Sequence, residues 1–254
     1  MAVVKTQGIV LRYVNYRDAD RIVTLFSREL GKIQVTARGC RRQKSRLLVA
    51  TELFCYGEYI LYFRQGRYTM TQCEIKEDFY NIRTNLDTLA YSTYIINLCE
   101  EAIQPGERNT YLFRLLLNTL SYLSYSDLNP LDITLIFSLK MIDLLGYRPQ
   151  LSACVRCGSE KPDEFTFSSR EGGILCKKCN NADPFAYNIH KGTLETMKYI
   201  FQMDSARMGT LRIGEEIRGE LKEIIKVYLT QRLEKQFKSW GFIERFDKIG
   251  RKEE

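Results

Sequence analysis

The sequence is poor in the residues and motifs on which most enzymes depend. It has a single histidine, His190, in 254 residues, which excludes metal sites built on a histidine pair and leaves one candidate for Ser-His-Asp chemistry. We interpret His190, just before a predicted helix, as a capping or surface residue. The phosphate-binding pattern G-x-x-x-x-G-K-[ST] is absent, and no H-x-E precedes the cysteine pairs as it does in zinc deaminases. The sequence therefore predicts a protein that is not an enzyme.

Long apolar runs are also missing. No stretch approaches the roughly 20 apolar residues that a membrane-spanning helix needs, and the first residues lack the apolar core of a signal peptide. We expect a cytoplasmic protein with no membrane partner. Thiols in a reducing compartment stay free or bind metal. Four scattered cysteines are interpreted as small buried apolar residues: Cys40, Cys55, Cys73 and Cys99.

Acidic residues are absent between Glu29 and Glu52, although the chain has 31 of them. Five of the six cations in this gap lie in a segment that we call the basic loop (residues 38–46). Residues 1–80 hold 14 Lys and Arg against 8 Asp and Glu, whereas the rest of the chain is nearly balanced. A local excess of cations on a loop is typical of a polyanion-binding surface. The candidate DNA-binding residues are Lys32, Arg38, Arg41, Arg42, Lys44, Arg46, Arg64 and Arg67.

The first third of the chain has the alternation of β-strands. Apolar residues alternate at 9–13, continue at 22–26 and 33–35, and form an aromatic strand at 53–63, with a last strand at 68–75. About five strands in this length match a five-stranded OB-fold barrel. The aromatic side chains of the last two strands are candidates for base stacking, although strand aromatics are more often core residues: Tyr56, Tyr59, Tyr62, Phe63 and Tyr68.

Helical spacing follows from about residue 80. Segments near 86–104, 111–122, 131–145, 194–203 and 217–233 are predicted helices. The predicted fold is α+β, with an N-terminal OB-fold barrel and an α-helical domain that carries an inserted four-cysteine, zinc-ribbon-like motif. The predicted organisation is an OB-fold nucleic-acid-binding domain at 1–79, helical segments at 80–150 and 188–247, a zinc-binding insertion at 151–187 and a flexible tail at 248–254.

The insertion contains two C-x2-C pairs separated by 18 residues: Cys154 and Cys157, then Cys176 and Cys179. Four thiolates close a tetrahedral shell around Zn²⁺ and leave no position for substrate, so the predicted ion is structural. A small hairpin at 165–167 and 172–175 would bring the pairs together. Free or redox-active thiols and an iron–sulfur cluster are the alternatives, but two pairs at this spacing favour one zinc ion.

The order of these parts resembles the bacterial DNA repair proteins of the RecO family. The resemblance is carried by residues 6–11 (TQGIVL), 20–27 (DRIVTLFS), 31–33 (GKI), 37–42 (ARGCRR), the Leu-Leu-Gly-Tyr run at 144–147 with Pro149, and the cysteine quartet. It implies a recombination mediator that binds single- and double-stranded DNA and anneals complementary strands. The resemblance also implies that the protein acts together with RecR and contacts the C-terminal tail of single-strand-binding protein. It further implies that the protein indirectly helps to load RecA and is associated with the nucleoid.

Two other hypotheses remain open from the residues alone. The first is a zinc-stapled protein–protein adaptor whose basic loop binds an acidic protein partner. The second, weaker one is an enzyme with an unrecognised carboxylate site. Binding to oligonucleotides separates the mediator from the adaptor, because only the mediator needs the polyanion to be DNA.

Overall fold

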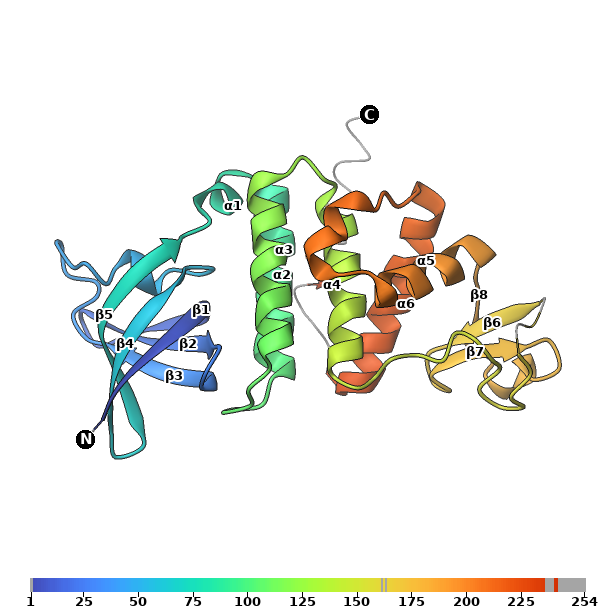
Figure 1. Cartoon of the computed structure of the whole chain (residues 1–254), viewed down its shortest axis with the longest axis horizontal. Coiled ribbons are helices and arrows are strands. Elements are labelled where there is room, and N and C mark those ends of the chain that lie inside the picture. Colours follow the sequence, from blue (N-terminus) through green and yellow to red (C-terminus); the bar gives the residue numbers. More distant parts are fainter. Residues whose placement is uncertain (1, 161, 163, 236–239, 242–254) are drawn as a thin grey trace. The chain divides into compact units, whose positions relative to one another are not determined.

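The computed structural model describes residues 2–160, 162, 164–235, 240 and 241 (Figure 1). The chain divides into two compact units. Of the described residues, 2–127 and 241 belong to unit 1, and 128–235 with 240 belong to unit 2. No helix in the described part of the chain is both long and apolar enough to cross a membrane.

Unit 1 begins with a closed five-stranded barrel in the order β1-β2-β3-β5-β4. Its strands are β1 (Ala2–Tyr16), β2 (Asp20–Ser27), β3 (Gly31–Ala37), β4 (Tyr56–Arg64) and β5 (Arg67–Glu77). The β3–β5 pairing is parallel and the other four are antiparallel. Inward-facing residues such as Val23, Val35 and Leu61 meet in a fully buried core.

The five predicted strands are confirmed, with one correction. The aromatic strand was predicted to start at Leu53, but β4 starts at Tyr56. Phe54 has a positive φ of 71°, and its N–H donates to the carbonyl of Val10 at 3.1 Å. A left-handed residue breaks the extended run, so residues 53–55 turn into the barrel before the strand begins.

Three helices complete the regular structure of unit 1: α1 (Tyr80–Thr84), α2 (Leu86–Ala102) and α3 (Thr110–Tyr125). Asn85 and Asn109 cap α2 and α3, because their side-chain oxygens accept backbone N–H groups of the first turn. Phe113 of α3 joins the helices to the barrel, with its ring centroid 5.6 Å from that of Phe26 and 6.2 Å from that of Tyr56. The barrel therefore rests on a helical layer of its own unit.

Unit 2 contains α4 (Pro130–Leu144), α5 (Lys191–Gln202) and α6 (Glu215–Leu233). The buried carboxylate of Asp132 on α4 accepts from Arg218 on α6, with a shortest distance of 2.5 Å. Short 3-10 helices lie at Val49–Thr51 in unit 1, and at Asn180–Ala182 and Ser205–Thr210 in unit 2. The predicted helices are confirmed within a few residues at their ends. The predicted flexible tail, residues 248–254, lies outside the described residues.

A small sheet in the order β7-β6-β8 carries the cysteine region of unit 2. It consists of β6 (Phe165–Ser168), β7 (Gly173–Cys176) and β8 (Tyr187–Asn188). The predicted hairpin is thus confirmed, and β8 is an addition that its two residues did not signal. Boundaries at residues 79, 150 and 187 stay a prediction.

Candidate nucleic-acid interface and metal centre

The basic loop follows β3 directly and projects its cations into solvent. Five side chains are exposed: Arg38, Arg41, Arg42, Lys44 and Arg46. Cys40, between them, is completely buried and points into the barrel core. The loop thus has an apolar attachment point with cations on both sides of it.

Two backbone N–H groups fasten the first part of the basic loop to Ala19 and Asp20, at the start of β2. The carboxylate of Asp20 accepts from the N–H of Gly39 at 2.7 Å. The carbonyl of Ala19 accepts from the N–H of Arg41 at 3.0 Å. Asp20, the first residue of β2, thus holds the first part of the basic loop.

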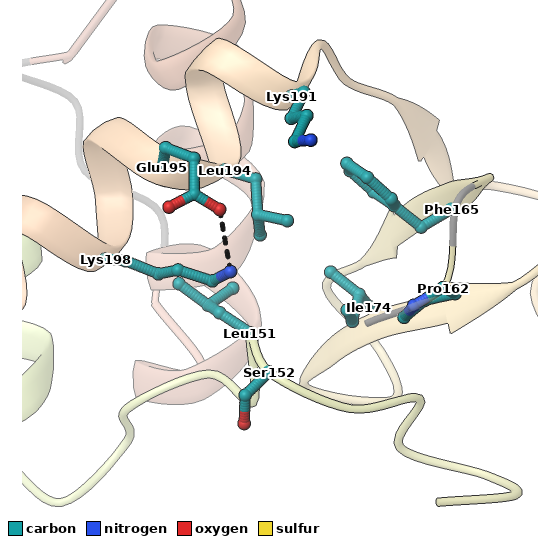
Figure 2. Close-up of a pocket in the computed structure, with 9 residues that line it drawn as sticks. All are labelled: Leu151, Ser152, Pro162, Phe165, Ile174, Lys191, Leu194, Glu195 and Lys198. Carbon is teal, nitrogen blue, oxygen red and sulfur yellow. Dashed lines mark hydrogen bonds and ion pairs between the residues drawn. The ribbon is translucent and has the colours of Figure 1, made fainter. Parts of the chain in front are cut away.

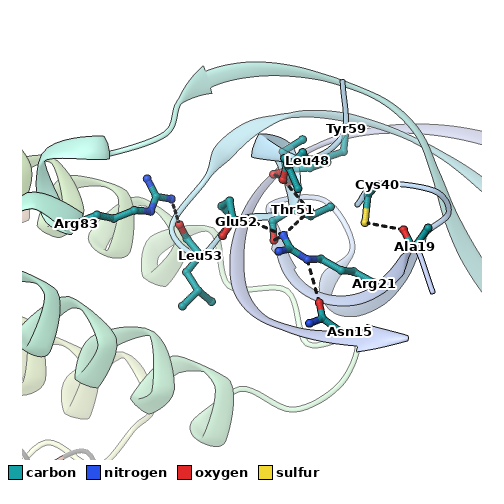
Figure 3. Close-up of polar contacts among 11 residues, drawn as sticks. Asn15, Ala19, Arg21, Cys40, Leu48, Thr51, Glu52, Leu53, Tyr59 and Arg83 are labelled. Carbon is teal, nitrogen blue, oxygen red and sulfur yellow. Dashed lines mark hydrogen bonds and ion pairs between the residues drawn. The ribbon is translucent and has the colours of Figure 1, made fainter. Parts of the chain in front are cut away.

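A buried arginine fastens the segment that follows the basic loop (Figure 3). Arg21 of β2 donates through Nη1 to the hydroxyl of Thr51 and to the Glu52 carboxylate, both at 2.9 Å. Its guanidinium carbon lies 3.9 Å from the ring centroid of Tyr13, a cation–π contact. The hydroxyl of the buried Tyr59 donates to the carbonyl of Ala50 at 3.0 Å. These contacts leave the cations between two fixed ends.

The remaining candidate DNA-binding residues differ in their surroundings. Arg64 and Arg67 pair across the β4–β5 turn and are exposed. Gln65 and Gly66 between them both have positive φ, the conformation of a tight two-residue hairpin turn. Lys32 is half-buried, and its ammonium donates to the carbonyl of Glu100 on α2. Lys32 therefore ties β3 to a helix, whereas the other cations face solvent; contact with DNA stays a prediction for all of them.

Some of the aromatic side chains predicted to stack on bases pack against other residues of unit 1. Tyr59 lies wholly in the core, and Tyr56 packs on Phe113. Phe63 and Tyr68 form a half-buried pair with ring centroids 4.7 Å apart. The expectation that many strand aromatics are core residues therefore holds for Tyr59.

The four clustered cysteines converge in unit 2. The sulfur atoms of Cys154, Cys157, Cys176 and Cys179 all lie within 4.8 Å of one another. The Sγ atoms of Cys157 and Cys176 are 3.6 Å apart, close to the edge of roughly 3.8 Å expected for a tetrahedron with Zn–S bonds of ~2.3 Å. The first pair turns through a bond from the N–H of Gly158 to the carbonyl of Cys154 at 2.9 Å, and Cys176 ends β7. The residues fit a tetrathiolate metal centre.

The pKa values of the four clustered cysteines favour a bound cation. Burial acts to raise the pKa of Cys154, but backbone N–H groups of Cys176, Cys157 and Arg156 outweigh it and lower this pKa to about 6. Burial, with hydrogen bonds to the other three thiols, raises the pKa of Cys179 to about 12. One thiolate forms readily, but adjacent thiolates oppose the last ionisation. A divalent ion among the sulfurs would remove that opposition.

The small sheet β7-β6-β8 and the four cysteines, which we call the cysteine module, are attached to the helices of unit 2 through α6. The rings of Phe167 on β6 and Tyr228 have centroids 5.8 Å apart, and the Tyr228 hydroxyl donates to the carbonyl of Tyr147 at 2.8 Å. Arg232 donates to the carbonyl of Ser169 at 3.0 Å. These contacts make the module part of the unit, because its hairpin contributes Phe167 to a helical core.

Comparison with known proteins decides the family. The model described as Recombination protein O N terminal matches residues 1–79, and that described as Recombination protein O C terminal matches residues 83–241. The DNA repair protein RecO of Acetivibrio thermocellus is 36% identical over 249 residues, covering 98% of this chain and 99% of the relative. The chain belongs to the RecO family. A second member, from Halalkalibacterium halodurans, is 37% identical over 246 residues, covering 97% of this chain and 96% of the relative.

This RecO-family chain also has a cavity between α5 and the cysteine module, of about 430 Å³ (Figure 2). Lys198 on its rim donates to Glu195 at 2.8 Å. A second hollow of about 410 Å³ shares Leu151, Ser152 and Lys198 with it and adds Arg148. We call the two together the α5 groove. The lining of the first cavity is Leu151, Ser152, Pro162, Phe165, Ile174, Lys191, Leu194, Glu195 and Lys198.

Residues outside these sites behave as structural groups. Cys40, Cys55 and Cys99 are completely buried and Cys73 is half-buried. Burial raises the pKa of Cys55 to about 11, which keeps that thiol protonated. The interpretation of these cysteines as small apolar residues is confirmed for the three buried ones.

The lone histidine of this RecO-family chain is a surface residue. His190 precedes α5, and its Nδ1 lies 2.5 Å from the carboxylate of Glu220 on α6. The hydrogen bond that His190 donates to Glu220, together with the charges of Glu216 and Glu220, raises the pKa of His190. The surface interpretation is confirmed, and the contact to Glu220 had no signal in the sequence.

Proposed function

We propose that this chain is a DNA-binding recombination mediator without enzymatic activity. It binds single- and double-stranded DNA, promotes annealing of complementary strands and, with RecR, helps load RecA onto DNA coated by single-strand-binding protein at the nucleoid. Membership of the RecO family supports the repair role. The single observation that carries the DNA-binding part is the exposed basic loop held at both ends on the barrel.

The chemistry of annealing follows from the charge of the loop. Each arginine or lysine that contacts a phosphate releases a counterion and lowers the repulsion between two strands. The fixed ends of the loop keep these cations on one side of the barrel, so two strands bound there are brought close together. The strand order β1-β2-β3-β5-β4 supports the OB-fold, a barrel that binds oligonucleotides on its surface.

The metal of the cysteine quartet is, on this proposal, one structural zinc ion. Four sulfur ligands favour zinc or an iron–sulfur cluster, and the C-x2-C pairs joined by a hairpin favour zinc. The ion would hold the turns at 154–157 and 176–179 together. It would take no part in DNA chemistry, since four thiolates leave no open coordination position.

Protein partners have a suitable surface in the α5 groove. Its apolar lining includes Leu151, Phe165 and Leu194, and two lysines lie among these residues. Such a groove fits a peptide with both apolar and acidic side chains, and the C-terminal tail of single-strand-binding protein is the occupant that we assign to it. The same groove is the observation that favours the second candidate function, a zinc-stapled adaptor for proteins.

Strand annealing tests the proposal directly. Two complementary labelled oligonucleotides are mixed with the full chain, and duplex formation is followed by energy transfer. We expect faster annealing with the wild type and near-spontaneous rates with the triple variant Arg41→Ala, Arg42→Ala and Lys44→Ala. Equal rates with and without the wild type would overturn the annealing function, and unchanged rates in the variant would remove the loop from it.

A further inference from the structure

The turn between β1 and β2 adds an exposed aromatic side chain beside the basic loop. Tyr16 is the last residue of β1 and pairs with Asp20, the residue that accepts from Gly39 of the loop. The carbonyl of Asp18 also accepts from the Arg41 guanidinium at 3.4 Å. The turn and the loop therefore form one continuous hydrogen-bonded surface.

The strand register turns Tyr16 away from the barrel interior. Tyr13 packs against the barrel core, and Asn15 accepts from Arg21 at the end of the barrel. Because side chains alternate along a strand, Val14 and Tyr16 lie on the opposite, outer face. Their exposed fractions are 48% and 43%. Among the described residues of the barrel, 2–79, Tyr16 is the one aromatic in the set of exposed large apolar side chains.

The surroundings of the Tyr16 ring also suit stacking with a flat aromatic partner such as a nucleobase. The guanidinium carbon of Arg17 lies 5.1 Å from its ring centroid, so a cation accompanies the ring. Arg17 has a positive φ of 51°, a left-handed conformation in the turn that follows β1. An aromatic ring next to an arginine is the combination on which unpaired bases stack in single-strand-binding proteins.

We propose that Tyr16 is a stacking residue that makes this surface prefer single strands over duplex. The inference rests on the proposed DNA-binding function and adds a residue that determines its specificity. Cations of the basic loop contact phosphates, which both forms of DNA carry. A base can stack on Tyr16 only when it is unpaired, so the ring contributes to the binding of one form alone.

Equilibrium binding of full-length Tyr16→Ala to a labelled 30-nucleotide strand and to the matching 30-base-pair duplex tests this. We expect the variant to lose about fivefold or more in affinity for the strand, with little change for the duplex. Tyr16→Phe should retain the wild-type preference, because it keeps the ring. Tyr80→Ala, which removes an exposed tyrosine on α1, is the matched control and should bind both forms normally.

A second measurement uses the wild-type protein and does not depend on how the variant folds. A strand of the same length made wholly of abasic positions keeps the phosphates and removes the bases. We expect the wild type to bind it at least about fivefold more weakly than the intact strand, and Tyr16→Ala to lose most of that difference. Equal affinity of the wild type for the intact and the abasic strand would overturn the inference. A Tyr16→Ala variant that loses the same affinity for the single strand and for the duplex would overturn it as well.

These outcomes are distinct from failure of the proposed function. If the wild type binds no DNA at all, the DNA-binding proposal itself fails. If the triple loop variant loses binding to strand and duplex while Tyr16→Ala changes neither, the loop remains the site and the stacking role of Tyr16 is wrong.

Discussion

Arg21 and Glu52 form an ion pair at 2.9 Å that joins strand β2 to the segment leading out of the basic loop. The Arg21 side chain is almost wholly buried, and the same Nη1 also donates to Thr51. Arg21 and Glu52 both lie outside the basic loop, which spans residues 38–46. The position of the cations of the basic loop therefore depends on a buried residue of β2.

Removal of this arginine charge should destabilise unit 1. Arg21→Met keeps an apolar stem over Tyr13 but removes the hydrogen bonds to Thr51 and Glu52. Because Glu52 is about one-third exposed, water would replace part of the lost interaction, and we expect a loss of about 2 kcal/mol in the free energy of unfolding. Urea denaturation measures it. Arg28→Met, at an exposed position on the same barrel, should change stability by less than about 0.5 kcal/mol; equal effects of the two variants would contradict the anchoring role.

The cysteine quartet should bind one zinc ion per chain. Cys157→Ser removes one of the four sulfur ligands, so we expect metal analysis to give a clearly reduced zinc content. Limited proteolysis should then cut within residues 151–187, since metal-binding energy in such modules is also folding energy. Cys73→Ser, which changes a half-buried thiol of the barrel, should retain the zinc. A Cys157→Ser variant with full zinc and unchanged proteolysis would show that the quartet is not the metal centre.

The α5 groove should bind a partner peptide. Lys191→Ala with Lys198→Ala removes two cations from the lining, and we expect about tenfold weaker binding of a labelled C-terminal peptide of single-strand-binding protein. Lys178→Ala, an exposed lysine of the cysteine module, is the control. Fluorescence polarisation gives both affinities. Peptide binding that the double variant leaves intact would move the partner site elsewhere.

His190 should make the stability of unit 2 depend on pH. The hydrogen bond with Glu220 raises the pKa of His190 above its ordinary value of 6.5. A raised pKa means that the stabilisation is fully present below about pH 6.5 and is lost as the pH rises through the folded-state value. Burial acts to raise the pKa of Glu220, but hydrogen bonds from Thr193 and His190 outweigh it and lower this pKa, so that carboxylate titrates at lower pH. We expect the midpoint of thermal unfolding to be higher for the wild type than for His190→Asn at pH 5.5, and the two midpoints to converge near pH 9. A difference that stays constant with pH would contradict the charge-based contact.

Much of the fold was visible in the sequence, because its signals are local. Alternation predicted the five strands, and the Cys154–Cys179 spacing predicted that four sulfurs would meet. The start of β4 was misplaced because the left-handed Phe54 sits inside an apolar run that reads as strand. The contacts of Arg21 and the exposure of Tyr16 were not predicted, since each depends on register: a shift of one residue would turn Arg21 outward and Tyr16 inward.

The central claim is that the basic loop binds DNA through its phosphates. The most direct test is fluorescence-polarisation binding of a labelled 30-nucleotide single strand to the zinc-containing protein across a salt series. With about five phosphates neutralised, log K should fall with log salt at a slope of about −3.5, roughly a hundredfold between 50 and 200 mM salt. The triple variant Arg41→Ala, Arg42→Ala and Lys44→Ala should flatten the slope to about −1.4. Absence of binding at low salt, or a triple variant with the wild-type affinity and slope, would contradict the account.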